Sequence, residues 1–274
     1  MSVKKEASGR RSVQVEVEVP GTPEEVWQAI ATGPGLSSWF VPAVFEEKDG
    51  KPVAVTLDFG PGMDSRSTVT VWDPPRTFSR TGEGWVPGSP PLATEFSVEA
   101  RAGGVCVVRV VQSLFASTDD WDGQLTGAEE GWPGIFRILR LYLTHFRGQR
   151  SAIMQVMVPV PGTAAEAWAT LTAALELNGA SVGQGWAAPA GVPVLGGVLE
   201  YISDSPYGAL VRLDQPVPGT AGFGTIEFGD TVMATLTFYL YGDQAAEAVA
   251  RETPRWQAWI EELFPMPAEP SQGK

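Results

Sequence analysis

One stretch of this sequence occurs twice, and the repetition limits the folds that the chain can adopt. VPGTPEEVWQAIAT runs from Val19 to Thr32, and VPGTAAEAWATLTA runs from Val160 to Ala173. The match extends into the segment before each stretch: Gln14, Val15, Val17, Val19, Pro20, Gly21, Thr22, Glu25 and Trp27 recur in order as Gln155, Val156, Val158, Val160, Pro161, Gly162, Thr163, Glu166 and Trp168. Because whole elements return in register, the sequence predicts a duplicated domain.

Each copy opens with the pattern of a strand followed by a capped helix. Valine alternates with polar residues over 13–19, which is typical of a strand with one wet face. Thr22 is a natural N-cap, Pro23 suits the first helical position, and Glu25 completes a T-x-x-E capping box. The sequence therefore predicts a strand, a turn and a helix in this order.

The remainder of each copy predicts an antiparallel meander and a closing helix. Several short strand-like runs are separated by turn signals rich in glycine and proline. Apolar residues then recur every three or four positions, which predicts a long amphipathic helix from about Glu129 to Phe146. The second copy is shorter, because it lacks a counterpart of GLSSWF and about two strands. Its own closing helix contains Pro254, where we expect a kink or a break.

Composition and charge narrow the classes of function. The chain has 274 residues and a net charge of −13, so nucleic acid and anionic membranes are poor partners. Cys106 is the only cysteine, which fits a reducing compartment, and we expect a cytoplasmic protein without a signal peptide or transmembrane helix. His145 is the only histidine, so a zinc site rich in histidine is excluded, and we expect it at a helix end or on the surface.

Four segments of the first half resemble the START/Bet v 1-like (SRPBCC) superfamily, and more narrowly bacterial homologues of the activator of the heat-shock-protein-90 ATPase. They are VEVPGTPEEVWQAIAT, GPGLSSWFVP, VTVWDPPRTFSRTGE and EEGWPGIFRILRLYLTHF. The resemblance implies an α+β helix-grip fold, in which a curved antiparallel sheet wraps a long C-terminal helix. It covers residues 12–147. Residues 152–265 are then a second, degenerate copy, and residues 1–11 and 266–274 are expected to be disordered tails.

The resemblance also implies an apolar groove between sheet and helix, since known members bind lipids, hydrophobic metabolites or polyketides. Core filling is the alternative for each residue, because protein interiors are closely packed. The candidates for lining a ligand cavity in the first half are Trp39, Phe40, Val55, Leu57, Phe59, Trp72, Trp85, Phe96, Val98, Trp132, Phe136 and Leu139.

Polar candidates for such a cavity are few. Arg109 lies in the apolar run VCVVRVVQ; it either orients an acidic ligand or, as we expect, faces outward and pairs across strands with a residue such as Glu99. Cys106 is expected to be a small buried hydrophobe. The carboxylates of TDDWDG lack the rest of a calcium loop, so a helix cap or a solvated loop is favoured. We therefore assign no catalytic residues, metal or cofactor.

Three classes of function remain. The leading hypothesis is non-catalytic binding of a hydrophobic small molecule in the first half, with the second half mainly structural. An enzyme of the cyclase, aromatase or hydrolase type is the second, although no acid–base pair is visible. A module that binds a protein partner, like a chaperone cofactor, is the third. We expect a monomer whose halves pack as two single-domain relatives would in a dimer.

Overall fold

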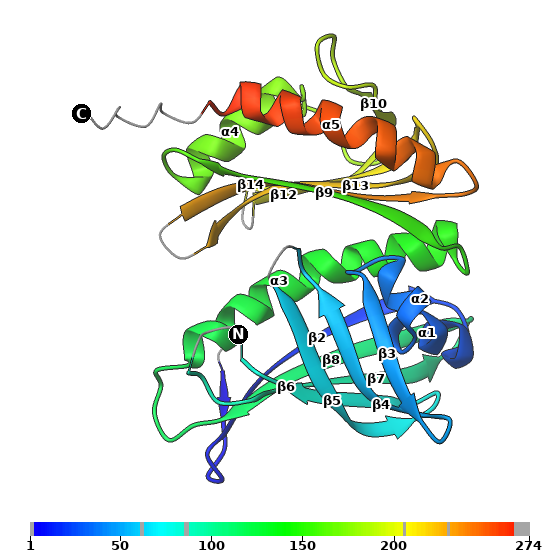
Figure 1. The fold of residues 1–274 in the computed structure, drawn as a ribbon, viewed down its shortest axis with the longest axis vertical. Coiled ribbons are helices and arrows are strands. Elements are labelled where there is room, and N and C mark those ends of the chain that lie inside the picture. Colours follow the sequence, from blue (N-terminus) through cyan, green and yellow to red (C-terminus); the bar gives the residue numbers. More distant parts are fainter. Residues whose placement is uncertain (1–2, 61–62, 85–87, 205–206, 229–230, 266–274) are drawn as a thin grey trace, which may run out of the picture. The chain divides into compact units, whose positions relative to one another are not determined.

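The computed structural model describes residues 3–60, 63–84, 88–204, 207–228 and 231–265. The chain divides into two units, Met1–Arg150 and Ser151–Lys274. In Figure 1 each unit is an antiparallel sheet with a long helix at the end of its sequence. The chain is therefore a tandem of two α+β helix-grip units, as the sequence predicted.

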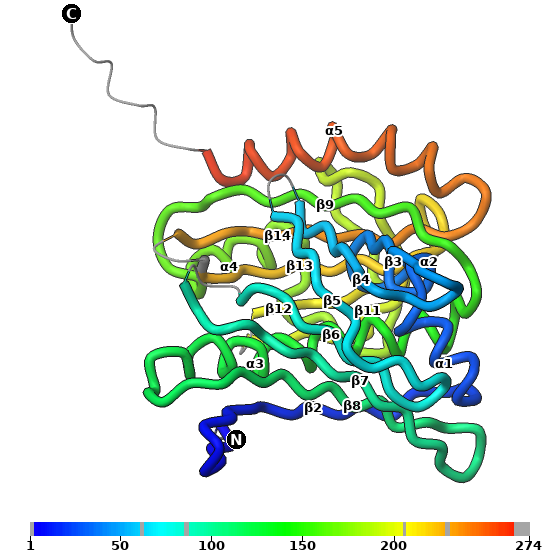
Figure 2. The backbone as a smooth tube through the Cα atoms, turned by 60° about the horizontal axis from the view of Figure 1, so that its bottom comes forward, coloured from blue at the N-terminus to red at the C-terminus, as the bar shows by residue number. Residues whose placement is uncertain are grey.

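The described residues of the first unit form one sheet of eight strands. In the sheet the strands lie in the order β1-β2-β8-β7-β6-β5-β4-β3. The opening strand β2 pairs along its whole length with β8, the last strand before the long helix, and Figure 2 shows the two side by side. The elements are β1 (Lys4–Lys5), β2 (Arg10–Pro20), α1 (Pro23–Ile30), α2 (Gly33–Ser37), β3 (Ala43–Lys48), β4 (Lys51–Asp58), β5 (Asp64–Asp73), β6 (Thr77–Gly82), β7 (Leu92–Arg101), β8 (Val105–Phe115), α3 (Asp122–Leu141) and a π-helical end, η1 (Tyr142–Phe146).

In the described part of the second unit, six strands lie in the order β10-β11-β12-β13-β14-β9. Its opening strand β9 again pairs with the last strand, β14, so the repeated segments hold equivalent places. The sheet is shorter than that of the first unit, as the sequence indicated: β10 has three residues, and among the described residues no strand follows it at that edge. The elements are β9 (Ser151–Val160), α4 (Ala164–Ala174), β10 (Gly185–Ala187), β11 (Gly196–Asp204), β12 (Tyr207–Gln215), β13 (Gly219–Phe228), β14 (Thr231–Tyr241) and α5 (Ala245–Leu263).

Both predicted capping boxes form. The Thr22 hydroxyl accepts from the Glu25 amide, and the Glu25 carboxylate accepts from the Thr22 amide at 2.8 Å. Thr163 and Glu166 repeat this reciprocal pair at the start of α4. Because each box satisfies amides that a helix start leaves unpaired, it fixes the point at which the chain turns from strand into helix.

A buried tryptophan covers the other end of the opening helix in each unit. The indole Nε1 of Trp39 donates to the Ala29 carbonyl in the last turn of α1, at 2.9 Å. Trp186 in β10 donates to the carbonyl of Leu175, the C-cap of α4, at 3.1 Å. In the second unit, Trp186 of the short strand β10 therefore takes the place of Trp39, although this unit lacks a counterpart of the GLSSWF segment.

Three elements differ from the sequence-based expectation. The long helix starts at Asp122 rather than near Glu129, because Leu125 is buried against Val13, Leu92 and Leu114. Pro254 lies inside α5 without breaking it, since Trp256 and Ile260 anchor the following turns in the core.

The third difference concerns the expected N-terminal tail. Residues 4–5 form β1 on β2, and Arg11 binds Asp119 and Asp122 at 2.6 Å, which ties this hairpin to the start of α3. The expected tail at 266–274 lies outside the described residues.

Candidate functional site

A cluster of aromatic rings occupies the interior of the first unit. Trp132 of α3 contacts Phe40, Phe96 and Phe136, with ring centroids 5.3–5.7 Å apart. Phe40 also contacts Trp39 and Phe59. Seven of the residues predicted from the sequence belong to one run of ring contacts: Trp39, Phe40, Phe59, Trp72, Phe96, Trp132 and Phe136.

The connection from Trp72 to this cluster runs through Phe78, which we did not predict. Phe78 is fully buried and lies between Trp72 and Phe96. It faces Phe96 directly in the pairing of β6 with β7, a signal that only the register reveals.

The other predicted residues lie in the interior or outside the description. Four aliphatic candidates are buried: Val55, Leu57, Val98 and Leu139. Phe40, Phe59 and Trp72 are only partly buried, so the ring cluster extends from the interior to the surface. Trp85 lies outside the described residues.

A row of buried polar side chains crosses the same sheet. The register pairs Gln112 of β8 with Thr94 of β7, and Thr94 with Arg80 of β6. Gln112 donates to the Thr94 hydroxyl at 3.2 Å, and Arg80 donates to the hydroxyl of Ser67 in β5 at 2.9 Å. All four side chains are at least nine-tenths buried. We call these residues, Gln112, Thr94, Arg80 and Ser67, the polar row.

The polar row shares the inner face of the sheet with the apolar residues. Side chains two positions apart in a strand point to the same side, so Arg80 lies on the side of Phe78, and Thr94 on the side of Phe96 and Leu92. Gly82 leaves room at the end of the row, because a Cβ there would lie 2.5 Å from the Ser67 hydroxyl.

Arg80 holds a buried charge without a counter-ion. Within the described residues no carboxylate pairs with it, and burial lowers the pKa of its guanidinium to about 10. It therefore stays charged at neutral pH. Gln112 has a similar deficit, since its Oε1 is buried and has no hydrogen-bond partner among the described residues. Buried polar groups are normally satisfied, so both groups require an explanation.

The sequence analysis considered Arg109 in β8 as a possible interior cation, but the buried arginine of this sheet face is Arg80 in β6. Arg109 faces outward, as expected, but its partner is Glu16 at 2.7 Å rather than Glu99. Arg80 was missed because TFSRTGE has no clear alternation: Phe78, Ser79 and Arg80 are all buried. The available signal was the even spacing of Phe78, Arg80 and Gly82.

The remaining polar candidates are Cys106, the carboxylates of TDDWDG and His145, and the structure gives the contacts of each. Cys106 is buried, and burial raises the pKa of its thiol, which donates to the Gly21 carbonyl at 3.3 Å. The carboxylates of Asp119 and Asp122 bind Arg11 and Lys5, so the pKa of Asp119 is lowered by Lys5 and then by Arg11. His145 is exposed beside Phe146 in η1. Among the described residues, no group of three or more His, Cys, Asp or Glu is placed to hold a metal ion.

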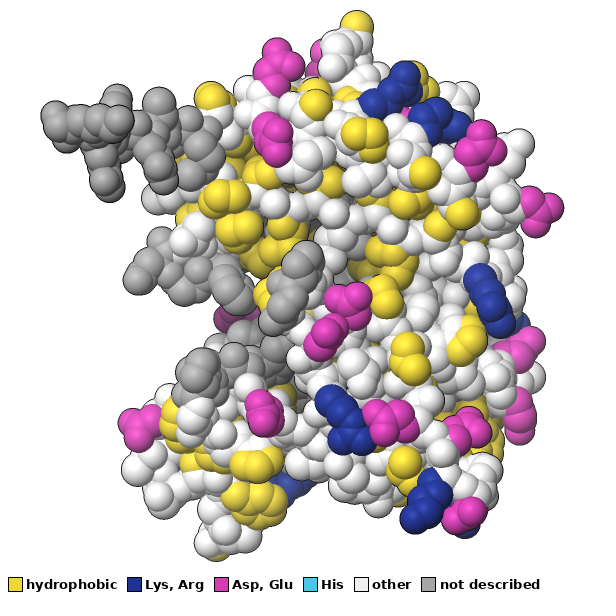
Figure 3. Space-filling model, viewed as in Figure 1, with side chains coloured by type: hydrophobic (Ala, Val, Ile, Leu, Met, Phe, Trp, Pro, Cys, Tyr) yellow, Lys and Arg dark blue, Asp and Glu magenta, His cyan; other side chains and the backbone are white. Residues whose placement is uncertain are grey.

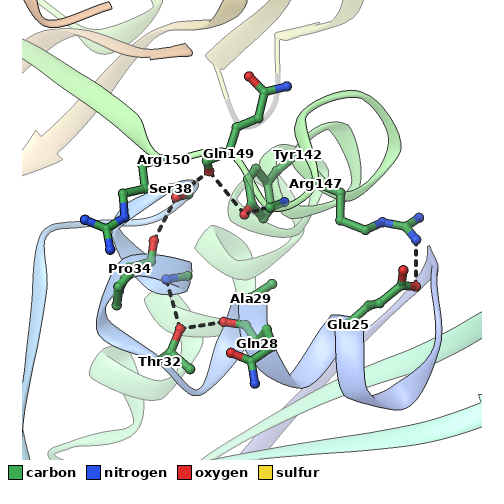
Figure 4. A pocket seen from close by; sticks show the side chains of 12 residues that line it. Glu25, Gln28, Ala29, Thr32, Pro34, Ser38, Tyr142, Arg147, Gln149 and Arg150 are labelled. Carbon is green, nitrogen blue, oxygen red and sulfur yellow. Dashed lines mark hydrogen bonds and ion pairs between the residues drawn. The ribbon is translucent and has the colours of Figure 1, made fainter. Parts of the chain in front are cut away.

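A separate cleft of about 410 Å³ lies at the α1–α2 end of the first unit. Figure 4 shows its walls, with Glu25 and Arg147 joined by an ion pair at 2.6 Å on one side. Ser38 and Tyr142 both donate to the Gln149 carbonyl, so the chain after η1 forms another wall. None of the predicted cavity residues lines this cleft, and Tyr142 is the one aromatic residue among those that line it.

The surface carries charges of both signs. On the face in Figure 3, basic side chains lie beside acidic ones, and hydrophobic side chains occur in scattered patches. In the part of the chain that the structure describes, no helix is both long and apolar enough to cross a membrane.

The fold and the interior of the first unit are those of a helix-grip domain. A comparison with family models identifies its family. Residues 10–140 match the family model described as polyketide cyclase / dehydrase and lipid transport. The first unit therefore belongs to the START/Bet v 1-like (SRPBCC) superfamily, as the resemblance implied. The description of this family names polyketides and lipids.

Solved structures that are similar to this chain match either about half of it or nearly all of it. Protein MLL2253 from Mesorhizobium loti is 23% identical, with a TM-score of 0.44, over 50% of this chain and 98% of that one. The di-domain ARO/CYC BexL from the BE-7585A biosynthetic pathway is 13% identical, with a TM-score of 0.43, over 94% of this chain and all (100%) of that one. The Aha1 dimer from Colwellia psychrerythraea is 19% identical, with a TM-score of 0.38, over 50% of this chain and 98% of that one. The comparison with curated proteins found no match.

Proposed function

We propose that the first unit binds a hydrophobic small molecule between its sheet and α3, without catalysing a reaction on it. The observation that carries this proposal is the continuity of the ring cluster. Phe40, Phe59 and Trp72 are partly exposed, and their contacts lead inward to Trp132 and Phe96. Aromatic surfaces that reach from the exterior into a domain are typical of sites for apolar ligands.

The buried side chains favour binding over catalysis. In the described part of the first unit the buried charged residues are Arg11 and Arg80, and no Asp, Glu or His is buried there. A cyclase-type reaction needs a group that gives or takes a proton near the substrate. A guanidinium that stays charged at neutral pH is poorly suited to that role.

The second unit has a supporting role in this proposal. Its interior is a single apolar cluster that includes Trp186, Phe223, Phe238 and Trp256, all in ring contact. Such an interior stabilises a fold by burial of apolar surface. The buried polar side chains of the described part of this unit are Thr172, Thr220, Thr225 and Glu252, and Glu252 is held by Arg251 and Arg255.

The test is titration of the full chain with phenylnaphthylamine, a neutral dye that fluoresces in apolar surroundings. We expect saturable binding, weakened about tenfold or more by Phe96→Trp, because a larger ring takes up space at the proposed site between the sheet and α3. Phe223→Trp is the matched control, since register places Phe223 in β13 where Phe96 lies in β7. Absence of saturable binding, or an equal loss in both variants, would contradict the proposal.

A further inference from the structure

The second unit shows that this fold does not require polar residues where the polar row lies. The repeat aligns Val13 of β2 with Met154 of β9, and these residues pair with Gln112 and Phe238 respectively. Following the register outward, Thr94 corresponds to Ala221, and Arg80 corresponds to Val211.

The second unit is thus apolar at the three corresponding positions. Phe238, Ala221 and Val211 are all buried in its core. One copy therefore maintains an interior guanidinium and amide where the other packs side chains that need no partner. A buried charge without a counter-ion destabilises a domain, so its retention has to be explained by something other than folding.

The polar row is also placed for recognition. It crosses adjacent strands between two apolar groups, with Leu92 and Leu114 on one side and Phe78 and Phe96 on the other. Arg80 offers charged N–H donors, and Gln112 offers an unpaired carbonyl oxygen two strands away. A ligand that satisfies both combines an acidic oxygen with a nearby hydroxyl or N–H group.

We propose that Arg80 and Gln112 form an anion subsite on the inner face of the sheet, which selects hydrophobic ligands that carry an acidic oxygen such as a carboxylate, a sulfonate or an ionised enol. This inference rests on the proposed function, because it assigns the polar end of the same ligand. Guanidinium and oxyanion form charge-assisted hydrogen bonds, which are strong where water is excluded. The amide oxygen of Gln112 then accepts from the donor beside the acidic group.

The experiment compares two dyes that differ in one group. Anilinonaphthalene sulfonate and phenylnaphthylamine share the same rings, but only the first carries an anion. We expect the full chain to bind the sulfonate dye about tenfold or more tightly than the neutral one, since one hydrogen bond to a charged group supplies such a factor. Arg80→Met should abolish this preference and leave the affinity for the neutral dye within about twofold.

Two further variants separate the subsite from general electrostatics. Arg109→Met removes an arginine from the outer face of β8, two strands away from Arg80, and it should leave the preference unchanged. Gln112→Leu should weaken binding of an analogue with a hydroxyl beside its acidic group more than it weakens the sulfonate dye. Should Arg80→Met fail to fold, as judged by its thermal transition, Arg80→Gln provides the same comparison.

The outcomes distinguish the two proposals. If neither dye binds the wild-type chain, the hydrophobic site is wrong and the subsite with it. If the neutral dye binds and the sulfonate is not preferred, or if folded Arg80 variants keep the preference, the subsite is wrong while the proposed function stands. A loss of preference in Arg109→Met of the same size would also overturn the subsite.

Discussion

The two units share a framework and differ in what they enclose. Both open with a strand, a Thr-Glu capping box and a helix whose last carbonyls meet a buried indole. In both, the opening strand pairs with the strand that precedes the closing helix. These common features are the ones that define local structure, because caps, turns and strand register act on the backbone.

The differences lie in the interior and at one edge of the sheet. The first unit carries the polar row and a sheet that continues through β4 and β3, whereas the second is apolar at the corresponding row and ends at the short β10. Duplication of the chain therefore provides an internal control: a position that is polar in one copy and apolar in the other is not determined by the fold.

The largest expected effect on stability comes from exchanging the residues at one position of the polar row, which is Arg80 in the first unit and Val211 in the second. Val211→Arg should destabilise the second unit by about 4 kcal/mol or more, because it buries a charge without a partner. Arg80→Val in the first unit should cost under about 1 kcal/mol, since it removes an uncompensated charge at the expense of a cavity. Denaturant unfolding of the full chain measures both. Similar losses in the two variants would mean that the first unit depends on Arg80 for folding.

The indoles that cover the opening helices test whether the units share a framework. Trp39→Phe and Trp186→Phe each leave a helix carbonyl without its donor and remove part of a buried ring. We expect a loss of about 1–3 kcal/mol in each case, as for other buried groups that lose a hydrogen bond. Thermal unfolding provides the measurement, followed by far-ultraviolet circular dichroism, which reports on the backbone rather than on the tryptophans. A loss confined to Trp39→Phe would show that Trp186 is not its equivalent.

Much of the framework could be predicted because it follows from local patterns. The capping boxes require residues three positions apart, and the strand of residues 13–19 follows from strict alternation. The start of α3 was placed too late for the opposite reason. Gly123, Thr126 and Gly127 are weak helix formers, and the helix extends to Asp122 because Leu125 packs against strands far away in the sequence.

The candidate site was predicted only as far as its apolar part. A resemblance to a helix-grip family was sufficient to indicate that Trp132, Phe136 and Phe96 face the interior. The polar row was not predictable in this way, since Gln112, Thr94 and Arg80 come from three strands that only the sheet register brings together. Arg80 and Arg109 both lie in strands, and their opposite orientations depend on where each strand pairs with its neighbours.

The glutamates of the capping boxes give a smaller effect that depends on pH. The pKa of Glu25 is lowered by the Thr22 amide and then by Arg147, whereas the pKa of Glu166 is lowered by Thr163 alone. A lowered pKa in the folded state means that the stabilisation is complete above the ordinary value of 4.5 and is lost as the pH falls through the folded value.

Glu25→Gln and Glu166→Gln should therefore lower the melting temperature at pH 7 and match the wild type once both carboxyls are protonated. Glu25→Gln should have the larger effect at low salt, because it also breaks the pair with Arg147, and added salt should reduce the difference. A pH-independent loss in both variants would indicate that the glutamates act through packing rather than charge.

The smallest expected effects concern ion pairs on the sheets, where the two units again offer matched examples. Arg109 pairs with Glu16 in the first unit at 2.7 Å, and Arg212 pairs with Glu200 in the second at 2.9 Å. The side chains of the first pair are 37% and 42% exposed, and those of the second are 25% and 27% exposed.

Double-mutant cycles with methionine for arginine and glutamine for glutamate should give coupling energies of about 0.2–1 kcal/mol, with the less exposed pair at the upper end. Solvent screens the more exposed pair more effectively, so added salt should reduce the Arg109–Glu16 coupling first. An Arg109–Glu16 coupling well above this range would mean that this outward-facing arginine has a structural role, and it would then be unsuitable as the control for Arg80.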